Sequence, residues 1–339
     1  MEETLDSYYL FGLQALQERL PPLAKEAEGV RAAEDVECVH RMRVASRRMR
    51  NALALFGEEL PHKHYDNWRG EMRRITQALG AARDTDVQIV WVQDFLKQVT
   101  DELQRVGIER LLLRLRQQRA KSQDKIGRAL DRLEDKRIFD DMDETLHELL
   151  VYARVYEVET LPTDLYRRAN EAIRLRLEEF LTYEPHIPYP ERSAELHQMR
   201  IAAKHLRYTL EVFGPLYDRA LRKPIKIVKE IQELLGQVHD CDVWIGYVPW
   251  FIEKERARTL RYFGEAVPAQ AFVPGLHALE EDRRWQRWHS YCAFRRFWEL
   301  TQDMHIWEHL REAITAQPES ALDAKEAGEE SRSQDADSA

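Results

Sequence analysis

The feature of this 339-residue sequence that most constrains its fold is an internal repeat. The segment His40–Gly57 aligns without gaps on His197–Gly214 at an offset of 157, and eight of the eighteen positions are identical. A second block, Leu79–Val87, matches Leu235–Val243 at an offset of 156. Two matched blocks in the same order are improbable by chance, so we predict two copies of one structural unit.

Each copy is predicted to be helical. The chain has only 13 Gly and 13 Pro, and the stretches between them place Leu and Ala at helical spacing among Glu, Lys, Arg and Gln, which excludes all-β and collagen-like classes. We predict an all-α protein of two antiparallel helical bundles, residues 1–155 and 156–316. Residues 317–339 form an acidic segment without aromatic residues, which we predict to be disordered. No apolar run is long enough for a membrane span, so no membrane partner is expected.

Glycines and aspartates in the repeated blocks suggest helix boundaries. Four glycines are predicted to end helices, two after the histidine-containing segments and two after the following ones: Gly57, Gly214, Gly80 and Gly236. Four aspartates are then predicted to begin the next helices, as N-caps at Asp84 and Asp240 and in the first turn at Asp86 and Asp242. Pairing with arginines of a neighbouring helix is a second role open to these carboxylates.

Basic residues form a stripe on the same helix of both copies. The stripe spans an arc of about 80° and comprises His40, Arg43, Arg47 and Arg50 in the first copy and His197, Arg200, Lys204 and Arg207 in the second. The apolar face, at other angles, comprises Met42, Ala45, Met49, Ala52, Leu53 and Phe56, and in the second copy Met199, Leu206, Leu210 and Phe213. Charges of one sign at i and i+3 or i+4 repel each other, so such a stripe favours binding of an anion.

A second basic stripe is predicted on the long helical stretch around residues 105–133. It falls within an arc of about 60° and comprises Arg110, Arg114, Lys121, Lys125, Arg128 and Arg132, opposite an apolar face of Leu111, Leu115, Ile126, Leu130 and Leu133. The late helix of the second copy is looser, with Arg284, Arg287 and Arg295 on one side. We interpret its aromatic residues Trp285, Trp288, Phe294 and Phe297 mainly as core.

Other interpretations of these residues remain open at this stage. A single charged stripe can be a solvated helix face, and a histidine near a helix start can be a packed structural residue. Metal ligation is disfavoured because no His, Cys or carboxylate stands at i+3 or i+4 from His40 or His197. Cys38, Cys241 and Cys292 are too widely spaced for a zinc motif and odd in number for a disulfide framework.

The paired His-x-x-Arg helices and the paired Leu-Gly-x-x-x-Asp-x-Asp-Val segments resemble the CHAD family, the conserved histidine α-helical domain. The resemblance covers roughly residues 5–312. It implies two bundles related by a pseudo-twofold axis, with basic helices that line a central groove or pore. It also implies non-catalytic binding of inorganic polyphosphate.

Carried over residue by residue, the resemblance assigns phosphate contacts to both stripes of the repeated helix, and Arg73 and Lys229 fit a further basic position of the family. With three residues of the long second stripe, the predicted polyphosphate-binding set is His40, Arg43, Arg47, Arg50, Arg73, Arg114, Lys121, Lys125, His197, Arg200, Lys204, Arg207 and Lys229. Arg83 of the first copy is replaced by His239 in the second, with no consequence assigned. No catalytic residue, metal or cofactor is predicted.

The predicted function is therefore a polyphosphate-binding module that associates with polyphosphate granules in the cytoplasm; the acidic N-terminus gives no sign of a secretory signal. An RNA-backbone-binding protein is the alternative, disfavoured by the net charge of −4 that remains for residues 1–316 without the acidic tail, and by basic stripes without interleaved aromatic residues. A metal-dependent phosphohydrolase would have to use the four aspartates. The segment Glu157–Leu161 lacks the lysine of the triphosphatase motif found in some family members, which argues against an enzyme. The oligomeric state is left open.

Overall fold

The structure is a computed structural model of the chain, and it describes residues 7–33, 35–155 and 162–315. These residues form helices and turns with no β-strand among them, which confirms the all-α prediction. The segment 156–161, where the sequence places the join between the copies and the Glu157–Leu161 motif, and the predicted acidic tail lie outside the described residues. No described helix combines the length and apolar character needed to traverse a bilayer.

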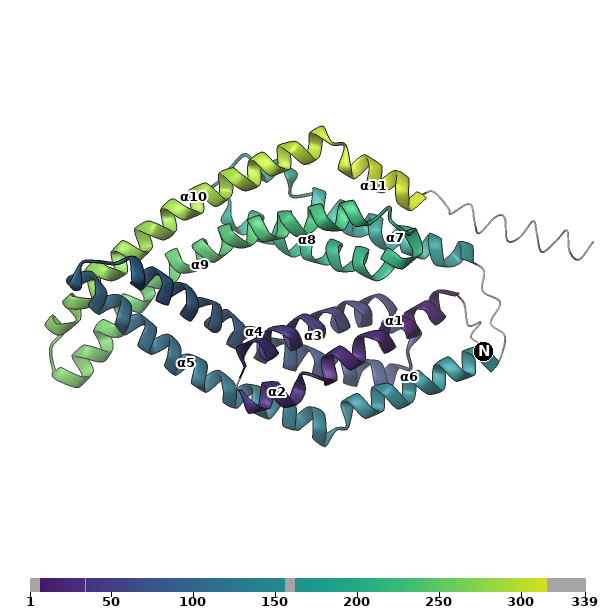
Figure 1. Cartoon of the computed structure of the whole chain (residues 1–339), viewed down its shortest axis with the longest axis horizontal. Helices are drawn as coiled ribbons and strands as arrows, with labels where there is room; N and C mark the ends of the chain where they lie inside the picture. The colour runs from purple at the N-terminus through teal and green to yellow at the C-terminus, as the bar shows by residue number, and fades with distance from the viewer. Residues whose placement is uncertain (1–6, 34, 156–161, 316–339) are drawn as a thin grey trace, which may run out of the picture.

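The two halves of the chain form two bundles that converge where α4 and α5 meet α9 and α10 (Figure 1). The helices of the first half are α1 (Ser7–Ala24), α2 (Ala27–Ala32), α3 (Val36–Phe56), α4 (His62–Gln98), α5 (Glu102–Asp135) and α6 (Ile138–Val155). Those of the second are α7 (Pro162–Leu181), α8 (Ser193–Phe213), α9 (Arg222–Phe263), α10 (Val273–Asp303) and α11 (Ile306–Thr315). Short 3-10 helices lie between them: η1 (Gly57–Glu59), η2 (Glu184–His186), η3 (Gly214–Tyr217) and η4 (Val267–Phe272).

The order of these elements repeats as the sequence repeat requires. The stripe-bearing helices α3 and α8 each contain 21 residues and continue through η1 and η3 into a much longer helix. Those longer helices, α4 and α9, contain 37 and 42 residues, and each packs along its successor, α5 or α10. Each copy thus presents its basic helix against the long helix that carries the second matched block.

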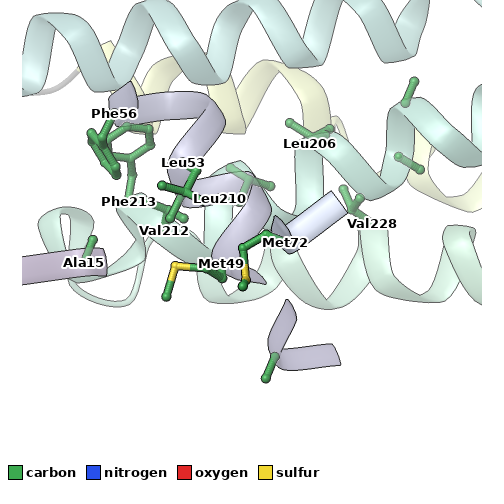
Figure 2. Close-up of a cluster of buried hydrophobic side chains, with 14 of the residues drawn as sticks. Ala15, Met49, Leu53, Phe56, Met72, Leu206, Leu210, Val212, Phe213 and Val228 are labelled. Carbon is green, nitrogen blue, oxygen red and sulfur yellow. The ribbon is translucent and has the colours of Figure 1, made fainter. Parts of the chain in front are cut away.

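The apolar faces predicted from helical spacing are buried. Every predicted core residue of α3 and α8 and of the long helix α5 is at most 9% exposed. One continuous hydrophobic core contains residues from both halves of the chain. Phe56 and Phe213, at equivalent positions of the repeat, lie side by side with ring centroids 6.0 Å apart (Figure 2). The two sequence copies therefore share one core, and this shared core sets the relative position of α3 and α8.

Two of the four predicted glycine boundaries are wrong. Gly80 and Gly236 lie inside α4 and α9, which continue for many residues beyond them. A Cβ at Gly80 would lie 3.6 Å from Nε of Arg43, and one at Gly236 would lie 3.5 Å from Nε of Arg200. Both distances are ordinary van der Waals contacts, so the packing does not require glycine at either position. A glycine costs an α-helix only about 1 kcal/mol, too little to end it when its neighbours are buried.

Because these helices continue, the predicted N-caps are also wrong. Asp84, Asp86, Asp240 and Asp242 lie within α4 and α9 rather than at helix starts. By contrast, α3 and α8 do end at Phe56 and Phe213 as predicted, although Gly57 and Gly214 are right-handed and begin 3-10 turns. At Gly57 a Cβ would lie 2.1 Å from the Tyr65 ring, so only glycine fits there.

The interpretation of the late aromatic residues as core holds only in part. Phe294 is buried in α10 and Phe297 is partly buried against the core. Trp285 and Trp288 are instead 60% and 53% exposed. The buried positions of α10 are taken by other residues, among them Leu276, Leu279 and Phe294.

Because both halves share one core, we expect the protein to unfold in a single cooperative transition. Replacing Phe213 by alanine removes a fully buried ring and should lower the free energy of unfolding by about 3–5 kcal/mol. Leu300→Ala, at an exposed site on α10, should change it by less than about 0.5 kcal/mol. Thermal melts followed by circular dichroism measure both. Two separate unfolding transitions, with the midpoint of only one of them lowered in Phe213→Ala, would contradict the shared core.

Candidate anion-binding cavity

A cavity of about 740 Å³ lies between the two bundles, among α3, α4, α8, α9 and α10. Six arginines and lysines line it but only two carboxylates: Arg43, Arg47, Arg83, Arg200, Lys204 and Arg283 against Asp84 and Asp240. His40 and His239 also line the wall. The protein is acidic as a whole, yet the walls of this cavity are strongly cationic.

The centre of the cationic wall is formed by equivalent residues of the two copies. Arg47 on α3 and Lys204 on α8 occupy the same position of the repeat, and Arg43 and Arg200 form a second such pair. The charges are close enough to interact: besides burial, Arg47, Arg200 and Arg43 lower the pKa of Lys204. The basic stripes that the sequence predicts on separate helices therefore converge at one site.

Several of the converging groups lack a hydrogen-bond acceptor in the described part of the chain. Nη2 of Arg47 and Nε of Arg200 are buried and make no hydrogen bond there. Nδ1 of His40 and Nδ1 of His197 share this property, so neither histidine is held by a structural hydrogen bond at that atom. An unpaired buried polar group costs about 1–3 kcal/mol, and an anion that accepts from these donors would remove that cost.

Burial and positive neighbours disfavour further protonation within the cavity. Burial, with repulsion from Arg47 and Arg200, lowers the pKa of Lys204 from 10.5 to about 7. Burial and nearby arginines also lower the pKa of His40 and of His197. Burial lowers the pKa of His239 to about 4, helped by His197, whose ring stacks on it with centroids 3.9 Å apart.

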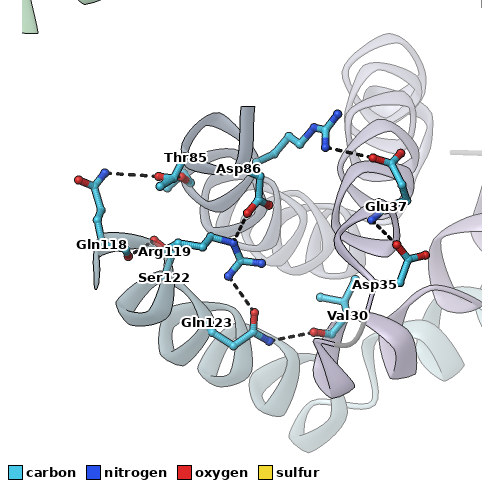
Figure 3. A network of polar contacts seen from close by, with 11 residues as sticks. Val30, Asp35, Glu37, Thr85, Asp86, Gln118, Arg119, Ser122 and Gln123 are labelled. Atoms are coloured by element: carbon cyan, nitrogen blue, oxygen red, sulfur yellow. Dashed lines mark hydrogen bonds and ion pairs between the residues drawn. The ribbon is translucent and has the colours of Figure 1, made fainter. Parts of the chain in front are cut away.

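The repeated aspartates mostly hold the walls of the cavity in place. Asp84 accepts a hydrogen bond from Arg43 at 3.2 Å, which confirms the second role open to these carboxylates. Asp86 accepts from Arg119 at 2.6 Å, and Arg119 also donates to Gln123 (Figure 3). The contact of Asp84 joins α4 to α3, and the contact of Asp86 joins α4 to α5.

The second copy has an equivalent connection between its two long helices. Asp242 on α9 accepts a hydrogen bond from Arg287 on α10, as Asp86 does from Arg119. Asp240 is the remaining aspartate and lines the cavity, where enclosure raises its pKa against the opposing influence of Arg200. No three His, Cys, Asp or Glu residues in the described ranges are grouped so that they could hold a metal ion.

Five of the thirteen predicted binding residues line the cavity: His40, Arg43, Arg47, Arg200 and Lys204. His197 lies directly behind the wall, against His239. The remaining members of the two short stripes lie elsewhere, since Arg207 donates to Glu211 at 2.8 Å and Arg50 is exposed close to Arg73. Lys229 pairs on the surface with Glu233.

The structure does not bring the α5 stripe to the cavity. Arg114 donates to Glu255 of α9 at 2.9 Å, and Arg110 donates to the same carboxylate at 2.6 Å. Glu255 is only 1% exposed, so these arginines compensate a buried charge. Lys121 and Lys125 are exposed on α5, outside the cavity lining. The basic stripe on α5 therefore serves in part to form ion pairs with acidic residues of neighbouring helices.

Sequence reasoning missed several residues of the cavity. Arg83 and His239 stand at the same position of the second repeated block, and that shared position was the available signal. Arg283 reaches the cavity from α10, outside both repeated blocks, so no spacing rule points to it. Trp91 and Trp244 come from the long helices beyond the matched segments.

Comparisons with known proteins agree with this architecture. The family model of the CHAD domain matches residues 14–248, a range that includes both stripe-bearing helices. The crystal structure of the CHAD domain from the plant Ricinus communis is similar with a TM-score of 0.58 and 22% identity, covering 82% of this chain and 92% of that chain. PptA from Streptomyces chartreusis is similar with a TM-score of 0.57 and 17% identity, covering 86% and 98%. A search of curated proteins gave no match. At these identities the structural likeness establishes a shared fold.

The lowered pKa of Lys204 gives a pH-dependent prediction. Between about pH 7 and pH 10.5 the Lys204 side chain binds its proton more strongly in the unfolded chain than in the folded protein. The unfavourable contribution of Lys204 to the stability of the fold therefore becomes smaller as pH rises. Lys204→Met should therefore raise the free energy of unfolding by about 1–2 kcal/mol at pH 6, and the gain should shrink toward pH 10. Lys125→Met, at an exposed site, is the matched control and should change little at either pH. Denaturant melts across this range measure both variants; a gain that is absent at pH 6 or that grows with pH would contradict the electrostatics.

Proposed function

This chain belongs to the CHAD domain family, and on that premise we propose that it binds inorganic polyphosphate in the cavity between its bundles without transforming it. The observation that carries the proposal is the convergence of Arg47, Arg200 and Lys204, whose charges are not matched by the two carboxylates of the cavity. We further propose that the bundles, residues 1–155 and 156–316, are related by a pseudo-twofold axis near Arg47 and Lys204.

The chemistry of polyphosphate suits this site. Each phosphate unit carries about one negative charge, so a linear chain supplies regularly spaced acceptors for guanidinium and ammonium donors. Arginine predominates in the wall, and its planar fork can donate to two phosphate oxygens at once. Recognition of this kind depends on charge rather than on sequence or shape, and binding releases counterions from the polyanion.

The arrangement offers little to a hydrolytic reaction. Of the four aspartates that a metal-dependent phosphohydrolase would use, Asp84, Asp86 and Asp242 each accept from an arginine. The cationic groups of the cavity hold a phosphate chain, but none of them is paired with a base in the manner of an activated nucleophile. We therefore propose a binding module, which in the cell would associate with cytoplasmic polyphosphate granules.

Variants can distinguish the cavity from the exposed stripe on α5. Arg47→Gln with Lys204→Gln should weaken binding of long-chain polyphosphate by about 100-fold or more, because charge-assisted hydrogen bonds contribute about 1.5–3 kcal/mol each. Lys121→Gln with Lys125→Gln removes the same number of charges outside the cavity and should weaken binding less than about threefold. Calorimetric titration of the full chain measures both. A larger loss in the α5 variant would place the binding surface on α5.

The dependence on salt tests the electrostatic origin of binding. Several arginines and lysines displace counterions together, so affinity for polyphosphate should fall by about 100-fold or more between 50 and 200 mM salt. RNA of matched charge, titrated under the same conditions, tests the alternative function and should bind more weakly than polyphosphate at both salt concentrations. A flat salt dependence would exclude this mechanism, and tighter binding of RNA would favour the nucleic-acid interpretation.

A further inference from the structure

One wall of the cavity is lined by aromatic and aliphatic side chains, which binding of a phosphate chain does not require. Trp91 and Trp244 lie there with ring centroids 5.1 Å apart, next to Val87 and Val243. Both valines keep more than 40% of their surface exposed although they line a concave site. The faces of aromatic rings carry a negative quadrupole, so they do not attract phosphate. This wall is therefore suited to an uncharged and planar group.

The aromatic wall is rigid and joins the cationic wall through an arginine. Trp244 is buried in a second hydrophobic cluster, against which Trp91 packs. The guanidinium carbon of Arg283 lies 3.8 Å from the centre of the Trp91 ring. A guanidinium over an indole can serve as a platform on which a nucleobase stacks, as arginine does in RNA recognition.

Carboxamide side chains stand beside this platform. Gln88, Gln237 and Gln286 all line the cavity. Ser290 connects two of them: its hydroxyl donates to Oε1 of Gln237 and accepts from Nε2 of Gln286, each at 3.4 Å. A carboxamide offers a donor and an acceptor together, which is the pattern that pairs with the edge of a base such as adenine.

We infer that this cavity also takes nucleoside 5′-triphosphates, with the triphosphate on Arg47, Arg200 and Lys204 and the base on the platform of Arg283 and Trp91. The inference rests on the proposed function, because the same cations would hold the phosphates. The volume of about 740 Å³ falls within the range of pockets that enclose ligands of nucleotide size. The glutamines then select a base from among other planar groups.

Binding of ATP and of inorganic tripolyphosphate by the full chain tests the inference, with tryptophan fluorescence and calorimetry as readouts. ATP should bind about tenfold more tightly than tripolyphosphate, since the base adds stacking to the same phosphate contacts. Gln237→Ala with Gln286→Ala should weaken binding of ATP by about fivefold to tenfold more than it weakens binding of tripolyphosphate or long-chain polyphosphate. Lys204→Gln should weaken binding of all three ligands: ATP, tripolyphosphate and long-chain polyphosphate.

The outcomes separate this inference from the proposed function. Equal or weaker binding of ATP relative to tripolyphosphate, with polyphosphate still bound, would overturn the base-binding inference and leave the proposed function intact. Failure of polyphosphate, tripolyphosphate and ATP alike to bind would overturn both. Equal competition by a short RNA that has no 5′-triphosphate would overturn the inference in favour of a single-stranded RNA site.

Discussion

Both copies of the repeat contribute side chains to one hydrophobic core, and this shared core makes the two basic helices, α3 and α8, face each other. Phe56 and Phe213 meet in that core, and the stripes on the other faces of the same helices cannot then move apart. Arg47 and Lys204 are held together although they repel, and this repulsion adds to burial in lowering the pKa of the lysine. The stability of the core offsets this repulsion, so the fold maintains a concentrated positive charge that an anion can relieve.

The distribution of acids explains how an acidic protein keeps this charge unmatched. Many carboxylates are already paired with arginines on the long helices, as Asp86 is with Arg119 and Glu255 is with Arg114. These pairs hold α4 and α9 against α5, and their residues lie outside the cavity lining. Net charge is thus a poor guide to the potential inside the site, because local pairing decides which cations remain available.

The sequence predicted the helical class, the two copies, the buried faces of α3, α8 and α5, and the basic stripes, because each of these follows from spacing along a helix. Helix boundaries at Gly80 and Gly236 were predicted wrongly, since a single glycine lowers helix stability by only about 1 kcal/mol and the buried contacts of α4 and α9 outweigh that cost. The pairing of Arg114 with Glu255 could not be predicted, because a one-dimensional pattern does not show that a residue 141 positions away lies next to it. Arg283 and Trp91 were missed for the same reason: only the fold brings α10 and the far part of α4 to the cavity.

A crystal structure of the full chain with bound medium-chain polyphosphate would test the central claim most directly. The convergence of α3 and α8 predicts phosphate groups within hydrogen-bond distance of Arg47, Arg200 and Lys204, with the chain passing between the two bundles. Phosphate density confined to the exposed face of α5, around Lys121 and Lys125, with none between α3 and α8, would contradict it.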